Sequence, residues 1–126
     1  MQPFIYMSTH AIKQGKQADI RTWYDEFVAL VNEAEPRLLA SQLFLNESET
    51  EGTIVLLHPD AESMDYHLQV TSDKIGEGLE LAPVQSIQIL GTPGPVLQEV
   101  LRRNAEAGVS VSVSPRHLGG LSRVAA

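Results

Sequence analysis

Residues 53–76, TIVLLHPDAESMDYHLQVTSDKIG, join a short apolar run to a segment in which apolar residues recur at helical spacing. The apolar run at 53–58 is rich in β-branched and aliphatic side chains, which is typical of a β-strand. The segment at about 60–75 begins with acidic residues, which favour the positive end of a helix dipole. The stretch therefore predicts a strand that passes directly into a helix, and Gly76 and Gly78 would end that helix.

The same alternation of strands and helices continues on both sides of this stretch. Its periodicities predict strands at 4–11, 38–46, 53–58 and 86–90, and helices at about 17–34 and 60–75. A polar turn at 47–52 joins two of these strands as an antiparallel hairpin. The order β-α-β-β-α-β predicts an α+β, ferredoxin-like fold with an antiparallel sheet.

The residues beyond this unit are expected to add a third helix and a further strand. The helix runs to about Ala107, and the valines that follow it alternate with serines as in a half-buried edge strand. We expect residues 1–126 to form a single domain in which 92–126 are a C-terminal extension.

Composition excludes several classes of protein. The chain has 126 residues and a formal net charge of −7, and an acidic surface repels phosphate backbones, so no nucleic-acid partner is expected. It contains no cysteine, which rules out disulfides, thiolate metal sites and cysteine nucleophiles. There is no phosphate-binding glycine fingerprint and no GxSxG elbow. Apolar runs are far shorter than a membrane span and no basic secretory signal is present, so we expect a cytoplasmic protein without a membrane partner.

Two of the predicted strands are apolar on both faces. The second strand carries Leu39, Leu43 and Leu45 on one face and Leu38, Ala40 and Phe44 on the other. The helices of a ferredoxin-like unit cover only one face of its sheet, so the other apolar face needs a cover as well. Two copies that pack sheet against sheet would provide it, and we therefore expect a two-fold homodimer.

These patterns resemble the antibiotic-biosynthesis monooxygenase-like (ABM) domains of the dimeric α+β barrel superfamily. The resemblance rests on IKQGK (12–16) before the long helix, on EPRLLASQLFLN (35–46) and on TIVLLHPDAESMDYHLQ (53–69). His67 matches a histidine often found in the second helix of such domains, and the resemblance covers about residues 3–91. It implies a dimeric α+β barrel.

The resemblance implies several activities on one scaffold, so it does not choose among them. They include cofactor-free oxygenation of aromatic or quinol-like compounds, haem degradation and isomerisation, and some members have no demonstrated activity. The chain departs from two catalytic patterns. Ser8 and His10 stand in the first strand where the oxygenases tend to carry Asn, and the only tryptophan, Trp23, lies on the first helix rather than the second.

Two functions remain open. The first is a cofactor-independent, monooxygenase-like oxidoreductase that acts on a small apolar or aromatic compound between the helices and the sheet. The second is a non-catalytic ligand-binding or interaction protein of the same fold. Neither reading calls for a cofactor or a metal, because the sequence contains no close pair of metal-binding histidines.

His67 and Trp23 are the first candidates for the site. His67 lies at the border of the apolar face of its helix, where an imidazole could serve as a general base. The alternative is a structural histidine that hydrogen-bonds the backbone. Trp23 lies at the edge of the aromatic stripe of the first helix, and it is either a wall of a ligand cavity or an ordinary core residue.

Three further residues are candidates for substrate binding. His10 lies either at the mouth of the cavity or in the interface between sheets, depending on which way its strand faces. His58 ends the third strand and is either a ligand contact or a capping residue of the loop. Arg116 belongs to the C-terminal tail and either binds an anionic group or is solvated.

Overall fold

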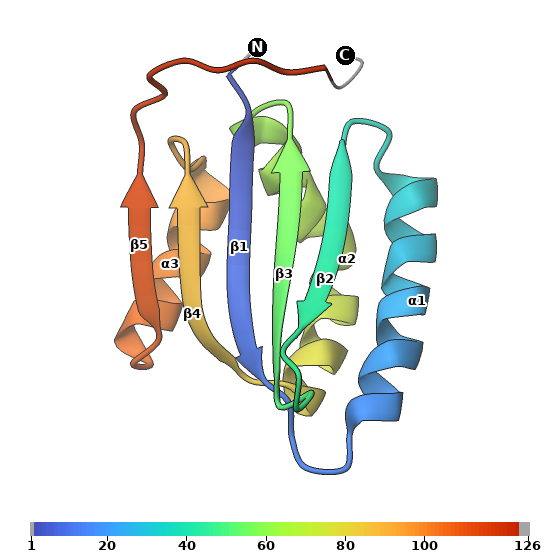
Figure 1. The fold of residues 1–126 in the computed structure, drawn as a ribbon. Coiled ribbons are helices and arrows are strands. Elements are labelled where there is room, and N and C mark those ends of the chain that lie inside the picture. Colours follow the sequence, from blue (N-terminus) through green and yellow to red (C-terminus); the bar gives the residue numbers. More distant parts are fainter. Residues whose placement is uncertain (1, 124–126) are drawn as a thin grey trace.

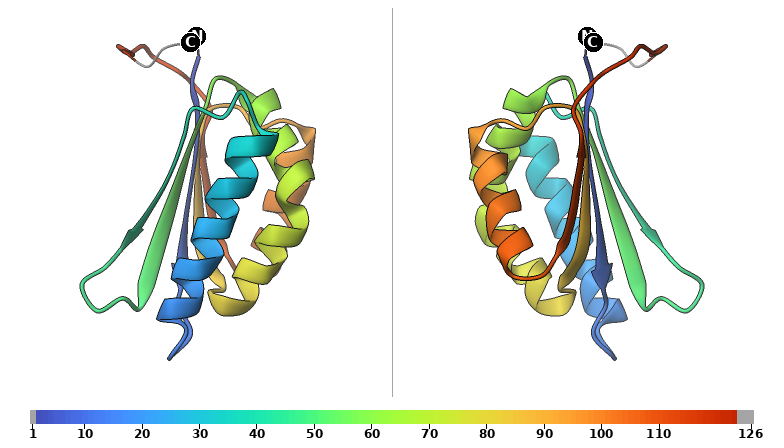
Figure 2. Two further views of the ribbon diagram at one scale, coloured as in Figure 1. Left: turned by 90° about the vertical axis from the view of Figure 1, so that its right-hand side faces the viewer. Right: turned by 90° about the vertical axis from the view of Figure 1, so that its left-hand side faces the viewer.

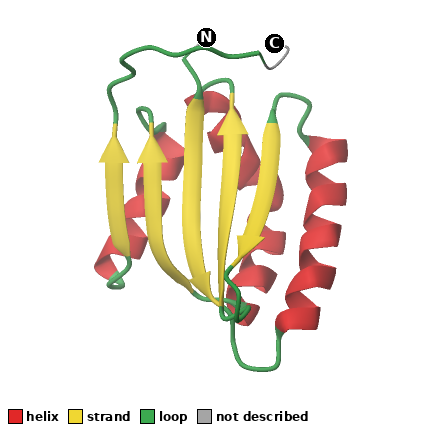
Figure 3. Cartoon of the chain, viewed as in Figure 1, coloured by secondary structure: helices red, strands yellow, loops and turns green. Residues whose placement is uncertain are grey.

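The computed structural model describes residues 2–123, which form one five-stranded sheet and three helices (Figure 1). In chain order the elements are β1 (Phe4–Ala11), α1 (Gln17–Ala34), β2 (Ala40–Leu45), β3 (Glu51–His58), α2 (Ala61–Leu81), β4 (Val84–Leu90), α3 (Pro95–Glu106) and β5 (Ser110–Ser114). The first six elements confirm the predicted β-α-β-β-α-β order, and the predicted third helix and fifth strand are also present (Figure 3).

The sheet has the strand order β2-β3-β1-β4-β5. β1 lies at its centre and pairs antiparallel with β3 and β4, while β2 pairs antiparallel with β3. β5 is parallel to β4, because α3 carries the chain back to the other end of the sheet before β5 begins. All three helices lie on the same face of the sheet (Figure 2). The fold is therefore the predicted α+β, ferredoxin-like one, extended by α3 and β5.

α2 is longer than predicted, because Gly76 and Gly78 do not end it. The helix begins after Asp60, whose side chain accepts a hydrogen bond from the backbone nitrogen of Ser63, and it continues to Leu81. Gly78 is buried within it, and a Cβ atom there would lie 2.6 Å from the ring of Trp23. The glycine thus allows the indole of α1 to lie directly on α2, so it serves packing and not chain termination.

The hairpin between β2 and β3 is tighter than predicted. β2 begins only at Ala40 and β3 already at Glu51. The side-chain oxygen of Asn46 accepts hydrogen bonds from the backbone nitrogens of Thr50 and Glu51, and Glu49 takes a positive φ of 54°. Because these bonds close the turn within 46–50, the flanking residues can pair.

The main core lies between the sheet and the helices. The side chains that are buried here come from the inward face of the sheet and from α2 and α3: Phe4, Leu56, Met64, Ile87, Ile89, Leu97 and Leu101. Residues of β1 and β3 that alternate with this set point to the opposite face of the sheet. That face carries apolar side chains too, and Phe44 is 64% exposed on it. The two-faced apolar character of the strands is thus present in the structure, and one face has no helix over it.

Within residues 2–123, no helix combines the length and the apolar character that crossing a lipid bilayer would require.

The contact between Trp23 and Gly78 predicts opposite effects for two glycine substitutions in α2. Gly78→Ala should lower the free energy of unfolding by about 1–3 kcal/mol, since the new methyl group overpacks against the indole. Gly76→Ala is the matched control, because nothing lies within 4 Å of a Cβ there. It should stabilise the protein by about 0.5–1 kcal/mol through helix propensity. Urea unfolding of both variants measures this, and a stabilised Gly78→Ala protein would refute the packing role.

Candidate functional site

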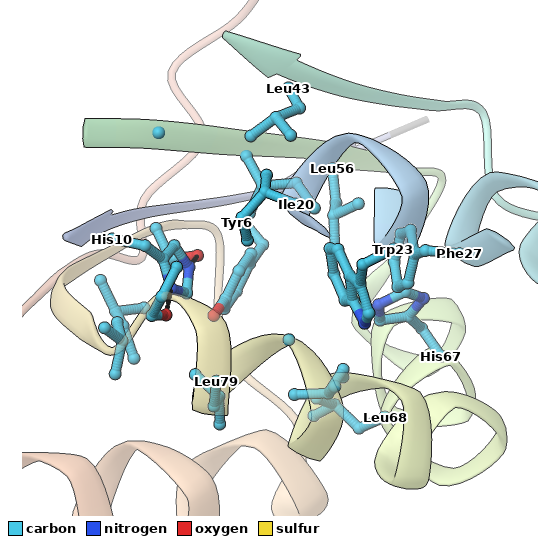
Figure 4. A pocket seen from close by; sticks show the side chains of 18 of the residues that line it. Tyr6, His10, Ile20, Trp23, Phe27, Leu43, Leu56, His67, Leu68 and Leu79 are labelled. Carbon is cyan, nitrogen blue, oxygen red and sulfur yellow. Dashed lines mark hydrogen bonds between the residues drawn. The ribbon is translucent and has the colours of Figure 1, made fainter. Parts of the chain in front are cut away.

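A cavity of about 130 Å³ lies between the sheet and the helices (Figure 4). Aromatic side chains of α1 and aliphatic side chains of β2, β3 and α2 form most of its wall. α3 adds Val100 and Asn104, so the C-terminal extension takes part in the cavity. The other polar groups of the lining fall into two sets, His67 of α2 and the β1 residues Tyr6, Ser8 and His10. Figure 4 shows His10 and His67 at opposite ends of the lining, with Tyr6 between them.

The size of the cavity limits what it can hold. Pockets for drug-sized ligands measure roughly 300–1,000 Å³, whereas an engineered apolar cavity of about 150 Å³ binds benzene. At about 130 Å³ this cavity accommodates one ring or a short chain. A compound with several fused rings would require its walls to move apart.

His67 is paired with a buried carboxylate. Its Nδ1 lies 2.7 Å from Oε2 of Glu35, and the two side chains are only 2% and 1% exposed. The edge of the imidazole packs against Phe27, with 5.6 Å between the ring centroids. A carboxylate that accepts a hydrogen bond from Nδ1–H fixes the tautomer of a histidine and leaves Nε2 as its basic nitrogen. The pair can therefore take up a proton at the cavity wall.

The structure corrects the expected environment of His67 and adds a residue to the site. His67 is fully buried, not at a border, and its partner is a carboxylate and not the backbone. Glu35 was not among the candidates, because a glutamate before a proline reads as the exposed end of a helix. The signal that could have found it is spacing. Phe27, Val31 and Glu35 are four residues apart, so Glu35 continues the buried stripe of α1.

His58 lies behind His67 and does not line the cavity. Its Nδ1 is 2.7 Å from Oγ of Ser63, and its ring centroid is 5.7 Å from that of His67. Burial, reinforced by the neighbouring His67, lowers the pKa of His58 to about 3. The residue is neutral at pH 7 and packs against the imidazole of the pair, so the structure does not place it where it would touch a ligand.

His10 lies on the helix-covered face of β1 and lines the cavity. Of its two expected positions, the structure thus selects the cavity over the sheet interface. Its Nδ1 is 3.0 Å from the carbonyl oxygen of Ala82, and its Nε2 is 2.7 Å from Oγ of Ser8. Burial lowers the pKa of His10, partly offset by the hydrogen bond to Ala82, so the ring is neutral at pH 7.

Trp23 lines the cavity, as its place at the edge of the stripe predicts. Its Nε1 donates a hydrogen bond to the carbonyl oxygen of Lys74 at 2.7 Å, and its ring stacks on Phe27 with a centroid distance of 5.1 Å. The indole therefore offers the cavity an apolar surface. Arg116 lies in the segment that follows β5, where it is exposed and outside the cavity wall. Among residues 2–123, no three acidic or histidine side chains are grouped to hold a metal ion.

The lowered pKa of His58 predicts that stability falls in mild acid. The unfolded chain binds a proton at this histidine below about pH 6.5, whereas the folded protein resists it until about pH 3. The free energy of unfolding should therefore decrease between pH 6.5 and 4, by up to about 1.4 kcal/mol per pH unit from this group.

The control is His58→Phe, which keeps a ring and removes the titration. Urea unfolding at a series of pH values should give a shallower slope for the variant than for the parent protein. Other groups that titrate in this range, among them His10 and the acidic residues, remain in both proteins. Equal slopes would show that His58 is not the source.

No known family profile matches the sequence, and neither does any curated protein. Solved structures do match. The crystal structure of MupZ from Pseudomonas fluorescens has a TM-score of 0.74 and 18% sequence identity, over 98% of this chain and 94% of that chain. A structure described as an antibiotic biosynthesis monooxygenase gives 0.60 and 16%, over 72% and 99% of the two chains. SnoaB, a cofactor-independent oxygenase from Streptomyces nogalater, gives 0.64 and 8%, over 76% and 98%.

At such low identity these likenesses establish the fold alone. The coverage of 98% by MupZ takes in the residues beyond β4, whereas the two oxygenase structures cover about three quarters of the chain. The extension formed by α3 and β5 is thus shared with a solved structure. The predicted resemblance is confirmed at the level of structure: the chain has the fold of the ABM-like proteins.

Proposed function

We propose that the protein is a small enzyme that removes a proton from a ring-sized apolar compound, with Glu35 and His67 as the base. The observation that carries the proposal is the buried hydrogen bond of 2.7 Å between these two side chains at the wall of an apolar cavity. Burying a carboxylate costs free energy unless a partner is in place. Buried titratable pairs at a cavity wall are candidates for a functional role.

The chemistry of the pair suits proton abstraction from carbon or oxygen. Glu35 holds His67 in the tautomer whose Nε2 carries a lone pair, and it stabilises the imidazolium that forms when this nitrogen takes a proton. The apolar wall formed by Trp23 and Phe27 keeps water away from the resulting anion. The substrate is then a weakly acidic molecule with a flat apolar body.

We propose oxygenation as the step that follows, with dioxygen as the co-reactant. An activated methylene group that loses its proton to His67 forms a carbanion, and the overall conversion R₂CH₂ + O₂ → R₂C=O + H₂O balances atoms and electrons. The same fold in SnoaB, a cofactor-independent oxygenase, supports this choice. The likeness is of fold, so the proposal itself rests on the site.

A second candidate is a non-catalytic binding protein. It is favoured because several polar groups of the cavity wall already have hydrogen-bond partners within the protein. The indole nitrogen of Trp23 donates to the carbonyl oxygen of Lys74, and Ser8 and His10 are hydrogen-bonded to each other. In this alternative the pair of Glu35 and His67 joins α1 to α2 and takes no part in chemistry.

Charge removal at Glu35 separates the two candidates. Glu35→Gln keeps the shape of the side chain but removes the carboxylate that stabilises a protonated His67. Two rates are measured with activated ring compounds: the exchange of their acidic hydrogen for deuterium, and the consumption of oxygen. Both rates should fall by about 10²–10⁴-fold, the usual contribution of a general base. His67→Ala alone is a poor test, since it leaves a buried carboxylate without a partner and should cost about 3–5 kcal/mol of stability.

The double variant Glu35→Gln/His67→Gln serves as the folded control, as it removes the carboxylate and its imidazole partner together. Thermal unfolding and calorimetric binding of the same compounds are measured alongside activity. Unchanged exchange rates in Glu35→Gln would refute the base. Compounds that bind but never exchange in the parent protein would favour the binding-protein alternative.

We also propose that the protein is a homodimer joined through the sheet face that lacks helices. The support is the apolar character of that face, where Phe44 is 64% exposed and Ile5, Met7, Val55 and Leu57 lie on the same side by alternation. Such an apolar surface on a soluble chain calls for a partner surface, and two-fold pairing is the commonest solution.

Two neighbouring residues of β2 test the dimer. Phe44→Asp alters the uncovered face and should give a folded monomer, while Leu43→Asp alters the cavity wall and should unfold the protein or cost several kcal/mol. Light scattering and circular dichroism distinguish these outcomes. A parent protein that is monomeric at micromolar concentration would refute the interface, which should bury about 2,000 Å² or more.

A further inference from the structure

We infer that Tyr6, Ser8 and His10 form an oxygen-binding subsite, in which the Tyr6 hydroxyl donates a hydrogen bond to a carbonyl or phenolate oxygen of the ligand. This subsite lies across the cavity from His67 (Figure 4). The part of the inference that concerns the reacting substrate rests on the function proposed above. The binding of an acceptor oxygen does not.

The direction of each hydrogen bond follows from the chemistry of the groups. The carbonyl oxygen of Ala82 can only accept, so Nδ1 of His10 is the nitrogen that carries the proton. The ring is neutral, which leaves Nε2 as an acceptor. Ser8 must therefore donate its hydroxyl proton to His10, over 2.7 Å. Both of these hydrogens are committed inside the protein.

Tyr6 holds the remaining hydroxyl hydrogen of the group. It lies two residues before Ser8 on the same face of β1, and its ring reaches from the strand into the space towards α2 (Figure 4). Burial raises the pKa of Tyr6, and a hydrogen bond between its hydroxyl and that of Ser8 only partly offsets this rise. The phenol therefore stays protonated at neutral pH. It is the donor that a ligand can reach.

These hydrogen-bond directions make the subsite selective for ligands with an acceptor oxygen. A ligand carbonyl or phenolate can receive the Tyr6 hydrogen in place of the Ser8 oxygen, and the bond from Ser8 to His10 stays in place. His10 acts here as a positioning residue, because it keeps the Ser8 hydroxyl turned away from the ligand. An apolar compound of the same shape leaves Tyr6 without a ligand partner and gains only from burial.

The two polar sides of the cavity together define the substrate class. The ligand is a conjugated, ring-sized molecule with an acceptor oxygen at Tyr6 and a weakly acidic hydrogen towards His67. When His67 removes that hydrogen, conjugation carries the negative charge to the oxygen. A donor already aimed at the place where charge develops lowers the barrier without reorganisation.

A matched pair of probes tests the subsite. Acetophenone and α-methylstyrene have nearly the same shape, but only the ketone has an acceptor oxygen. Calorimetry gives the ratio of their dissociation constants in the parent protein and in Tyr6→Phe. The preference for the ketone should fall by about 5- to 10-fold in Tyr6→Phe, the value of one hydrogen bond. Tyr24→Phe is the control, since Tyr24 bonds Ser41 outside the cavity wall, and it should leave the ratio unchanged.

The outcomes separate this inference from the proposed base. An equal ratio in the parent protein and Tyr6→Phe, or no binding of acetophenone to the parent, overturns the subsite. A loss of preference in Tyr6→Phe supports it, and the same preference should persist in Glu35→Gln, which leaves β1 intact. If the preference is present but no exchange or oxygen consumption occurs, the subsite stands and the proposed reaction fails.

Discussion

The contact between Glu35 and His67 is the constraint on which the rest of the site depends. Both side chains are almost completely buried, and taking a carboxylate out of water costs several kcal/mol unless its partner is in place. The pair joins the C-cap of α1 to the N-terminal third of α2, so separating the two helices would leave the Glu35 carboxylate without its partner. Oε1 of Glu35 has no hydrogen-bond partner among the described residues, so half of this buried carboxylate is unsatisfied.

A second contact, made by Trp23, also joins α1 to α2. Trp23 lies on Gly78 and bonds the backbone of Lys74, so its indole bridges α1 and α2 at their other end. The ring also forms part of the cavity wall. The electrostatic contact and the steric contact thus hold α1 and α2 at two points. The cavity lies between these two helices and the sheet.

Most of the fold could be predicted from the sequence, because hydrophobic periodicity reflects burial directly. The apolar stripe of α1 and the alternation in β1 and β3 identify the elements and their inward faces. The errors came from residues whose role depends on a distant neighbour. Gly78 reads as a helix breaker until Trp23 is placed against it. Glu35 reads as a solvated helix end until His67 is found beside it.

The candidate site was predictable only in part, for the same reason. His67, Trp23 and His10 were identified from residue type and face, and all three line the cavity. Glu35, Lys74 and Ala82, which hydrogen-bond His67, Trp23 and His10 respectively, lie 32, 51 and 72 residues away along the chain, and no local pattern predicts these pairs. The bond between His10 and Ser8 is the exception, since the two residues are two apart on one strand face. A buried polar side chain depends on the residue that hydrogen-bonds it. Hydrophobic periodicity shows whether a position is buried but does not identify that partner.

The location of the cavity separates ligand binding from assembly. The cavity occupies the face of the sheet that the helices cover, while the exposed apolar side chains of the strands lie on the other face. Successive residues of one strand therefore serve different surfaces: Leu43 faces the cavity and Phe44 the uncovered side. A partner docked on the uncovered face would not fill the cavity, but it would stiffen the sheet that forms its floor. β1 carries Tyr6, Ser8 and His10 at the centre of that sheet, so their alignment would gain most from such stiffening.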